Sequence, residues 1–238
     1  MNSEDLQNWR GSLSPPEDCP YLEGQVWENF ILDPGAEVSS DMHEHLLESG
    51  FRRMGSLFFQ PACKSCNECR TMRLATQTFQ PSKSLRRARN KNLDLVVTMT
   101  EPNYTEEKRA LLGDYLTSRH VGPMIADEEG VREFMFSGSG RAKEMTYYMD
   151  GELIAVGLVD VLPNIVSSLY FFYKPTLSRR SLGIASMMFE IEWAQKNGRE
   201  WYHPGFMVRD CPAMSYKARF GPAEVLGEDG EWLPLDVG

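Results

Sequence analysis

The sequence predicts a mixed α/β (α+β) fold, built on a largely antiparallel sheet and preceded by a basic, cysteine-containing N-terminal region. Apolar strand patterns follow one another from residue 142 to residue 173, short turn signals separate them, and helices ended by glycine flank them. With 238 residues, 42% of them hydrophobic, the chain can bury a substantial core. We divide it into an N-terminal region, 1–92, and a second region, 93–238, because the pattern becomes regular at that point.

The N-terminal region is irregular and is interrupted by six prolines. A helix is predicted over 38–49, where Gly50 ends it, and short strands over 57–60 and 72–78. The second region alternates more regularly, and the pair Asp150-Gly151 predicts a tight hairpin. Its predicted elements are strands at 93–100, 142–149, 152–162, 165–173, 200–203 and 223–226, and helices at 104–120, 127–136, 181–197 and 212–220.

Composition excludes several classes of protein. No apolar run approaches the roughly 18 residues of a membrane-spanning helix, and the first residues lack the layout of a signal peptide. We therefore expect a cytoplasmic protein without a membrane partner. Five cysteines without an export signal do not predict a disulfide framework.

The net charge of −9 hides a strongly basic segment. Between Arg52 and Lys91 there are ten Lys or Arg and a single acid, Glu68, so this segment carries +9 and the remainder −18. Such a local excess is typical of a binding site for phosphate or carboxylate. The alternative for residues 82–91 alone is a solvated helix face.

A glycine loop lies before the long helix at 181–197. Arg180 to Ala185 match the pattern R/Q-x-x-G-x-G/A, and the order of elements resembles the GCN5-related N-acetyltransferase fold. In that fold the loop turns backbone N–H groups toward the pyrophosphate of coenzyme A. Arg180, Ser181 and Gly183 are therefore candidate substrate-binding residues. The alternative is that Gly183 allows close packing of helix and sheet.

Several ordered motifs carry a more specific resemblance. They are the segments 50–55, 59–63, 79–87, 169–175, 177–183 and 214–220, together with Cys-Pro-Tyr-Leu at 19–22. In these segments the chain resembles the arginyl-tRNA–protein transferase family. Its length and its Cys-Pro-Tyr-Leu start are similar to those of the bacterial branch of that family, the aspartate/glutamate leucyltransferases. The resemblance implies transfer of an amino acid from aminoacyl-tRNA to the N-terminal Asp or Glu of a protein. It also implies that the modified protein is marked for N-end-rule degradation and that a protease adaptor would bind it.

The chemistry implied by this resemblance needs little from the enzyme beyond positioning and oxyanion stabilisation, because the ester is already activated. The candidate catalytic residues are Tyr170 and Tyr216 as hydroxyl donors or relays, and Lys217 as a cation near the oxyanion or the terminal phosphates. Tyr173 is a further candidate. Strand alternation places Tyr170 and Tyr173 on opposite faces, so one of them should reach the site.

Arginines are the candidates for substrate binding. Arg52 and Arg53 would hold the carboxylate of the acceptor, because the guanidinium fork suits a carboxylate. Arg86 and Arg87, with Arg89 and Lys91 at helical spacing, would contact tRNA phosphates. The two roles could be exchanged.

Cysteines form the remaining motif. Cys63, Cys66 and Cys69 are spaced C-x-x-C-x-x-C, and Cys19 could add a fourth thiolate to a zinc or iron–sulfur site. Free structural thiols are the alternative, since Leu22 stands where eukaryotic relatives have a second cysteine. Cys211 stands apart and is predicted to be inert. The histidines His43 and His45 are predicted to be solvated on their helix.

Three functional hypotheses follow. The first is an aminoacyl-tRNA–dependent protein transferase, whose donor residue is leucine by resemblance to the branch, with arginine as the alternative. The second is a coenzyme A-dependent N-acetyltransferase, which would not need the basic segment. The third is a zinc-ribbon RNA-binding module, which would not need the glycine loop or the acyltransferase strand order.

Overall fold

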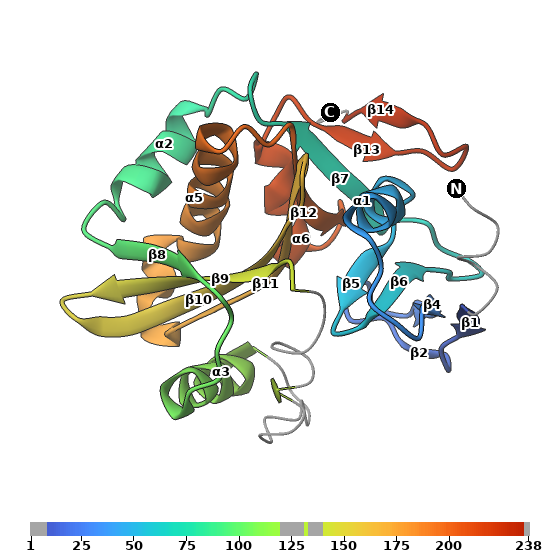
Figure 1. Cartoon of the computed structure of the whole chain (residues 1–238), viewed down its shortest axis with the longest axis horizontal. Coiled ribbons are helices and arrows are strands. Elements are labelled where there is room, and N and C mark those ends of the chain that lie inside the picture. The colour runs from blue at the N-terminus through green and yellow to red at the C-terminus, as the bar shows by residue number, and fades with distance from the viewer. Residues whose placement is uncertain (1–8, 120–130, 133–139, 236–238) are drawn as a thin grey trace.

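An eight-stranded sheet forms the centre of the molecule, and a four-stranded sheet packs beside it (Figure 1). The computed structural model describes residues 9–119, 131–132 and 140–235. The large sheet has the order β14-β13-β7-β12-β11-β10-β9-β8, the small sheet has the order β1-β4-β6-β5, and β2 pairs with β3. The predicted mixed α/β fold with a large, mainly antiparallel sheet is confirmed.

The strands are β1 (Arg10–Leu13), β2 (Glu17–Asp18), β3 (Val26–Trp27), β4 (Asn29–Asp33), β5 (Arg52–Met54), β6 (Leu57–Pro61), β7 (Arg70–Ala75), β8 (Val96–Thr100), β9 (Ala142–Met149), β10 (Glu152–Val161), β11 (Ile165–Tyr173), β12 (Trp201–Met207), β13 (Glu224–Leu226) and β14 (Trp232–Pro234). The helices are α1 (Ser40–Glu48), α2 (Lys83–Asn90), α3 (Glu106–Arg119), α5 (Leu182–Lys196) and α6 (Pro212–Ser215), with 3-10 helices η2 (Pro175–Arg180) and η3 (Tyr216–Arg219).

Local sequence signals account for most of these boundaries. Asp150 and Gly151 both have positive φ, 52° and 84°, as the two central residues of a type I′ turn require, and the predicted hairpin is confirmed. Ser39 caps α1 by accepting from the Met42 N–H, and Gly50 follows the helix with φ of 89°. The helix predicted over 127–136 lies outside the described residues except at 131–132.

The small sheet was not predicted as a sheet. Its strands have three to five residues, and all four residues of β1 are exposed, so they carry no alternation of apolar and polar side chains. In addition, β7 lies between β12 and β13 in the large sheet, although it comes from the predicted N-terminal region. Strands of the two predicted regions therefore share one sheet, and the division of the chain at residue 92 stays a prediction.

Helices cover both faces of the large sheet. On one face Met188 and Ile191 of α5 and Leu85 of α2 pack against β7 and β12, while on the other Leu112 of α3 packs against β10 and β11. Figure 1 shows α2 and α5 on one side of the sheet and α3 on the opposite side. None of the helices in the described parts of the chain is long and apolar enough to cross a membrane.

Strands β11 and β12 are parallel but pair over three residues only, from Ile165 with Trp201 to Ser167 with His203. The next residue of β12 is Pro204, which has no N–H to donate, and β12 is bulged there against β7. Leu169 is an extra residue of β11 at a bulge against β10. We call the place where the two strands stop pairing the strand fork.

A buried ion pair fastens the small sheet to β10. Arg53 donates Nε and Nη2 to the two oxygens of Asp160, both at 2.8 Å, and His43 Nε2 lies 3.3 Å from the same carboxylate. The solvated position predicted for His43 is wrong: its side chain is 0% exposed, because Asp160 gives α1 a polar partner inside the protein. Burial alone would raise the pKa of Asp160, but the contacts with His43 and Arg53 hold it below its usual value.

We expect Asp160→Asn to destabilise the protein by about 3–5 kcal/mol at neutral pH, because it leaves the Arg53 guanidinium buried without its counter-charge. Since the folded pKa of Asp160 is lowered, its contribution is present above the unfolded value of about 3.9 and disappears as pH falls through the folded pKa. Urea unfolding of both proteins between pH 3 and 7 measures this. Glu37→Gln, which removes an exposed partner of Arg141, is the control and should cost at most about 1 kcal/mol. Equal stabilities of wild type and Asp160→Asn at neutral pH would refute this role.

Candidate active site

Arg52 enters the strand fork from β5. Its Nη1 donates to Ser167 Oγ at 2.9 Å and its Nη2 to the Ser168 carbonyl. Gly205, with φ of 93°, makes room for it, because a Cβ there would lie 3.3 Å from Nη2. The side chain is buried, and burial lowers its pKa to about 10. Among the described residues, both oxygens that accept its hydrogen bonds are neutral.

Lys217 enters the fork from η3. Its Nζ donates to the Phe206 carbonyl of β12 at 2.7 Å, and the residue is 8% exposed. Burial, reinforced by the positive charge of Arg52, lowers its pKa to about 7. An amine that titrates near neutral pH can serve either as a cation or as a proton acceptor.

Tyr216 and Gly183 bring the start of α5 to the same place. A Cβ on Gly183 would lie 4.0 Å from the Tyr216 hydroxyl. Burial raises the pKa of Tyr216 to about 12, so its hydroxyl stays a donor at neutral pH. Ser181, left-handed with φ of 58°, starts α5 without capping it by its side chain, and the Ile184 N–H donates to the Ser181 carbonyl instead.

The tyrosines of β11 separate as alternation predicts. Tyr170 packs with Phe172 on the face that α3 covers, and burial raises its pKa to about 12. The Tyr173 ring lies 5.8 Å from that of Phe171 and 5.2 Å from that of Tyr115 of α3 between ring centroids. Of the two tyrosines, Tyr173 is the one whose charge acts on Tyr216.

Two predicted binding residues already have partners within the protein. Arg53 is held by Asp160, as described above. Arg180 donates to Asn92 Oδ1 and to the Lys91 carbonyl, both at 2.9 Å, and pairs with Asp94. Arg180 thus fastens η2 to the end of α2.

The basic segment 52–91 does not form one continuous surface, because four of its ten cations pair with acids elsewhere in the chain. These pairs are Arg53 with Asp160, Lys64 with Glu28, Arg73 with Glu48 and Glu224, and Arg89 with Glu192. Arg89 thus anchors α2 to α5.

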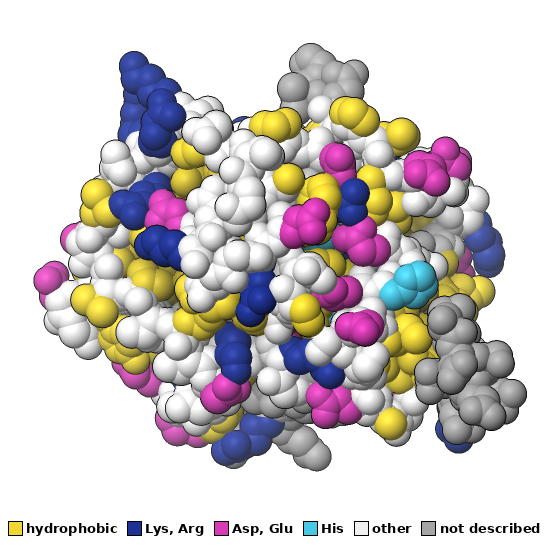
Figure 2. All heavy atoms as spheres, turned by 45° about the horizontal axis from the view of Figure 1, so that its top comes forward, with side chains coloured by type: hydrophobic (Ala, Val, Ile, Leu, Met, Phe, Trp, Pro, Cys, Tyr) yellow, Lys and Arg dark blue, Asp and Glu magenta, His cyan; other side chains and the backbone are white. Residues whose placement is uncertain are grey.

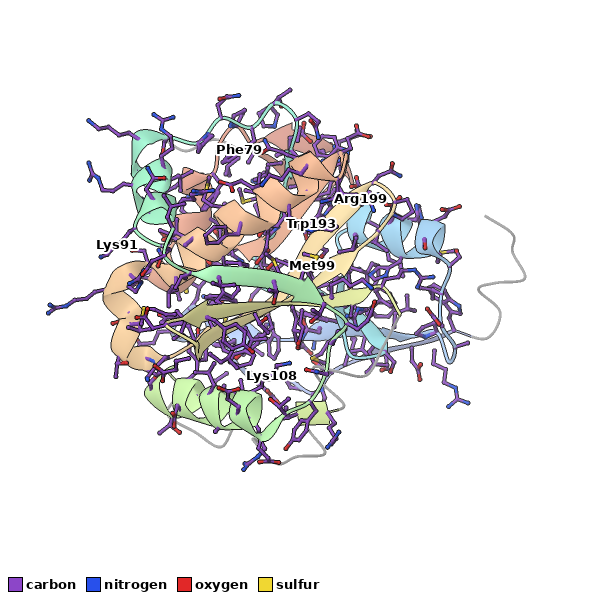
Figure 3. All side chains as sticks on the ribbon, turned by 60° about the vertical axis from the view of Figure 1, so that its left-hand side comes forward. Phe79, Lys91, Met99, Lys108, Trp193 and Arg199 are labelled. Atoms are coloured by element: carbon purple, nitrogen blue, oxygen red, sulfur yellow. The ribbon has the colours of Figure 1, made fainter. Side chains whose placement is uncertain are left out.

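Exposed cations remain on α2. We define the α2 surface by the exposed residues Lys83, Arg86, Arg87 and Lys91. The Lys91 Nζ donates to the Arg179 carbonyl at 2.6 Å, which joins this surface to the loop before α5. Figure 2 shows dark-blue side chains at the corner of the molecule where α2 lies, and Figure 3 shows Lys91 at the outer edge.

The cysteines gather although they are far apart in sequence. Burial and the charges of Cys19, Cys63, Cys66 and Cys211 raise the pKa of Cys69 to about 12, so Cys211 belongs to the same cluster rather than standing apart. All five are free thiols, and three of them line a cavity of about 990 Å³. In the described part of the chain, no group of three or more His, Cys, Asp or Glu is arranged to hold a metal ion.

The strand order is that of the GCN5-related N-acetyltransferase-like fold, as predicted. Solved structures with this sheet include FemX, with a TM-score of 0.51 and 11% identity over 82% of this chain and 68% of that chain. The C-terminal DUF2156 domain of an Agrobacterium fabrum protein also gives 0.51, with 12% identity over 83% and 64%. These similarities concern the fold alone.

Sequence comparison identifies the family. The models for the N and C termini of the arginine-tRNA-protein transferase match residues 17–87 and 107–227. The aspartate/glutamate leucyltransferase of Saccharophagus degradans is 32% identical over 96% of this chain and 98% of its own length, and that of Marinobacter nauticus is 33% identical over 94% and 95%. The chain belongs to the arginine-tRNA-protein transferase family, and the predicted resemblance is confirmed.

We expect Gly183→Val to reduce aminoacyl transfer by about tenfold or more, because a branched side chain between α5 and Tyr216 would displace a substrate from the first turn of the helix. Single-turnover transfer and thermal unfolding measure the two effects separately. Gly113→Val is the matched control, since that helical glycine in α3 has open space around its Cβ position. If Gly183→Val instead unfolds while Gly113→Val does not, Gly183 serves packing.

Proposed function

We propose that this chain transfers leucine from leucyl-tRNA to the α-amine of proteins that begin with Asp or Glu. The observation that carries the proposal is the near full-length similarity to relatives named aspartate/glutamate leucyltransferase. The products would be marked for N-end-rule degradation and handed to a protease adaptor. Transfer of arginine by the same chemistry is the alternative donor choice.

The reaction exchanges an ester for an amide. The neutral α-amine of the acceptor attacks the ester carbonyl carbon, a C–N bond forms, and the C–O bond to the terminal ribose breaks. The amine nitrogen gives up a proton, and the ribose oxygen of the tRNA gains one. The product amide is more stable than the ester, so this exchange needs no further energy source.

The strand fork offers the groups that this reaction needs. The Lys217 ammonium or the Tyr216 hydroxyl would stabilise the oxyanion, and the neutral lysine would accept the proton of the amine. Tyr173 is preferred to Tyr170 as the further hydroxyl, because its charge acts on Tyr216. Positioning by the buried fork would supply most of the remaining acceleration.

Of the two arginines proposed to hold the acceptor, Arg52 is now the better candidate. Arg53 already has a bidentate carboxylate partner in Asp160, whereas Arg52 is hydrogen-bonded to serine oxygens. A carboxylate brought to Arg52 would replace weaker neutral acceptors by a charged one. We therefore assign Arg52 to the acceptor and the α2 surface to the tRNA.

A metal site at Cys19, Cys63, Cys66 and Cys69 is a separate proposal, with zinc or an iron–sulfur cluster as occupant. Clustering of the thiols around Cys69 supports it, and free structural thiols remain the alternative. The thiols are not arranged as ligands in the described residues, so no step of the transfer is assigned to such a group.

The proposed function is tested with reporter peptides beginning with Asp, Glu, Asn or Ala, incubated with leucyl-tRNA, arginyl-tRNA or acetyl-coenzyme A. We expect a mass gain of one leucine on the Asp and Glu peptides, and much slower reaction of the Asn peptide, because an amide cannot neutralise Arg52. Mass spectrometry reads the outcome. Gain of an acetyl group would establish the coenzyme A alternative, for which the uncapped start of α5 is the supporting feature.

Charge reversal on the α2 surface, Arg86→Glu with Arg87→Glu, should weaken tRNA binding and flatten its dependence on salt. Each lost phosphate contact lowers the slope of log affinity against log salt by about 1. Binding titrations at several salt concentrations measure this slope. Arg10→Glu with Lys64→Glu makes the same charge change on the exposed far side of the molecule and should leave the slope nearly unchanged. An unaltered slope in the α2 variant would remove α2 from the tRNA site.

A further inference from the structure

Glu190 is a buried acid that the sequence did not single out. It lies on the inner side of α5 with 1% exposure. Its Oε1 accepts from Ser186 Oγ at 2.7 Å, and its Oε2 accepts from the Tyr202 hydroxyl of β12, also at 2.7 Å. Ser186 Oγ is in turn 3.0 Å from the hydroxyl of Tyr147 on β9. The carboxylate is therefore the centre of a hydrogen-bond network that links α5, β9 and β12.

The same carboxylate reaches the other side of the strand fork. The Ser168 side chain of β11 faces Glu190 and favours its charged form, and the Ser168 carbonyl accepts from Arg52. Glu190 thus faces residues of both strands: Tyr202, which still pairs with Val166, and Ser168, the first residue of β11 beyond the pairing. Ser168 therefore lies between the Glu190 carboxylate and the Arg52 guanidinium.

The negative charge of Glu190 also acts on the buried cations beside it. Lys217 of η3 faces three ionisable groups: Arg52 of β5, Glu190 of α5 and Cys211. Arg52 itself faces Glu190, Tyr202 and the Arg53–Asp160 pair. Two buried cations side by side are unfavourable without an anion. Among the described residues, Glu190 is the carboxylate that acts on Lys217, because Asp160 is occupied by Arg53 and His43.

Three tyrosines complete the surroundings of the carboxylate. Tyr147, Tyr202 and Tyr216 all face Glu190, and burial raises the pKa of each of them, so they act as neutral donors near pH 7. Burial also raises the pKa of Glu190. The Glu190 charge favours the charged form of Lys217, so we expect the two groups to titrate together.

We infer that Glu190 is a positioning residue of the transfer reaction: its buried carboxylate holds β11, β12 and α5 together at the strand fork and supplies the negative charge that Arg52 and Lys217 face. This inference rests on the proposed function, because the fork is the proposed site of transfer. Glu190 acts through Ser168, Arg52 and Lys217 rather than by touching the substrate.

The first test is the pH dependence of single-turnover transfer in Glu190→Gln. Glutamine keeps the shape, replaces one accepting oxygen by a donating NH2 group and removes the charge, so protonation of Lys217 becomes less favourable. We expect the limb of the profile near neutral pH to move to lower pH by about one unit. Ser186→Ala is the matched control, since it removes one hydrogen bond to Glu190 and no charge, and its limb should stay in place. A limb that stays in place in Glu190→Gln, or moves equally in Ser186→Ala, overturns the inference.

The second test needs no substrate and reads the titration in the wild-type protein. Lysine labelled with ¹³C at Cε, with the Lys217 signal assigned by its absence in Lys217→Met, gives the titration of that amine in the wild-type protein. Glutamate labelled at the side-chain carboxyl carbon gives the titration of the Glu190 carboxyl group. We expect each group's curve to show an inflection where the other titrates. Independent curves, or an ordinary lysine titration, would refute the pairing even if transfer occurs, whereas absence of transfer with coupled curves would count against the proposed function alone.

Discussion

Strands β11 and β12 share three residue pairs, and the polar centre of the molecule lies where that pairing stops. Beyond the fork, the backbone carbonyls of both strands lose their partner strand and need other donors. Arg52 donates to the Ser168 carbonyl and Lys217 to the Phe206 carbonyl, so the cations are held by the same groups that the fork leaves open. The cause is visible in β12, where Pro204 cannot donate and Gly205 adopts positive φ beside the Arg52 guanidinium.

Burial of these cations is possible because acids from distant elements accompany them. Asp160 of β10 neutralises Arg53, and Glu190 of α5 lies beside Arg52. Lys217 donates to a backbone carbonyl, and burial lowers its pKa to about 7. A permanently charged lysine would be a poor proton acceptor, whereas one that titrates near neutral pH can exchange a proton with an amine. The fork therefore combines structural support with chemical reactivity.

Local signals predicted the elements well, and long-range contacts explain what was missed. The turn at Asp150-Gly151 and the start and end of α1 follow from residues adjacent in sequence. The wrong predictions concern residues whose partners are far away in the sequence. Arg89 pairs with Glu192, 103 positions distant, and a count of charge along residues 52–91 cannot reveal such pairs. The buried position of His43 depends likewise on Asp160. Glu190 carries no local signal, because α5 also carries Glu192, and the two acids differ only in their distant partners, which for Glu190 include Ser168 and Tyr202.

The contacts between α2 and α5 connect the basic surface with the fork. Arg89 fixes α2 on the outer side of α5 through Glu192, and Asn92 donates to the Arg180 carbonyl just before α5 begins. The exposed cations of α2 therefore keep a constant position relative to the first turn of α5. A nucleic acid bound by its phosphates along α2 would be held in a fixed register, and a fixed register is what an enzyme needs to bring one terminal ester to one carbonyl site. Phosphate binding at a distance would thus serve the chemistry by orientation, while the buried charges of the fork act on the reacting atoms.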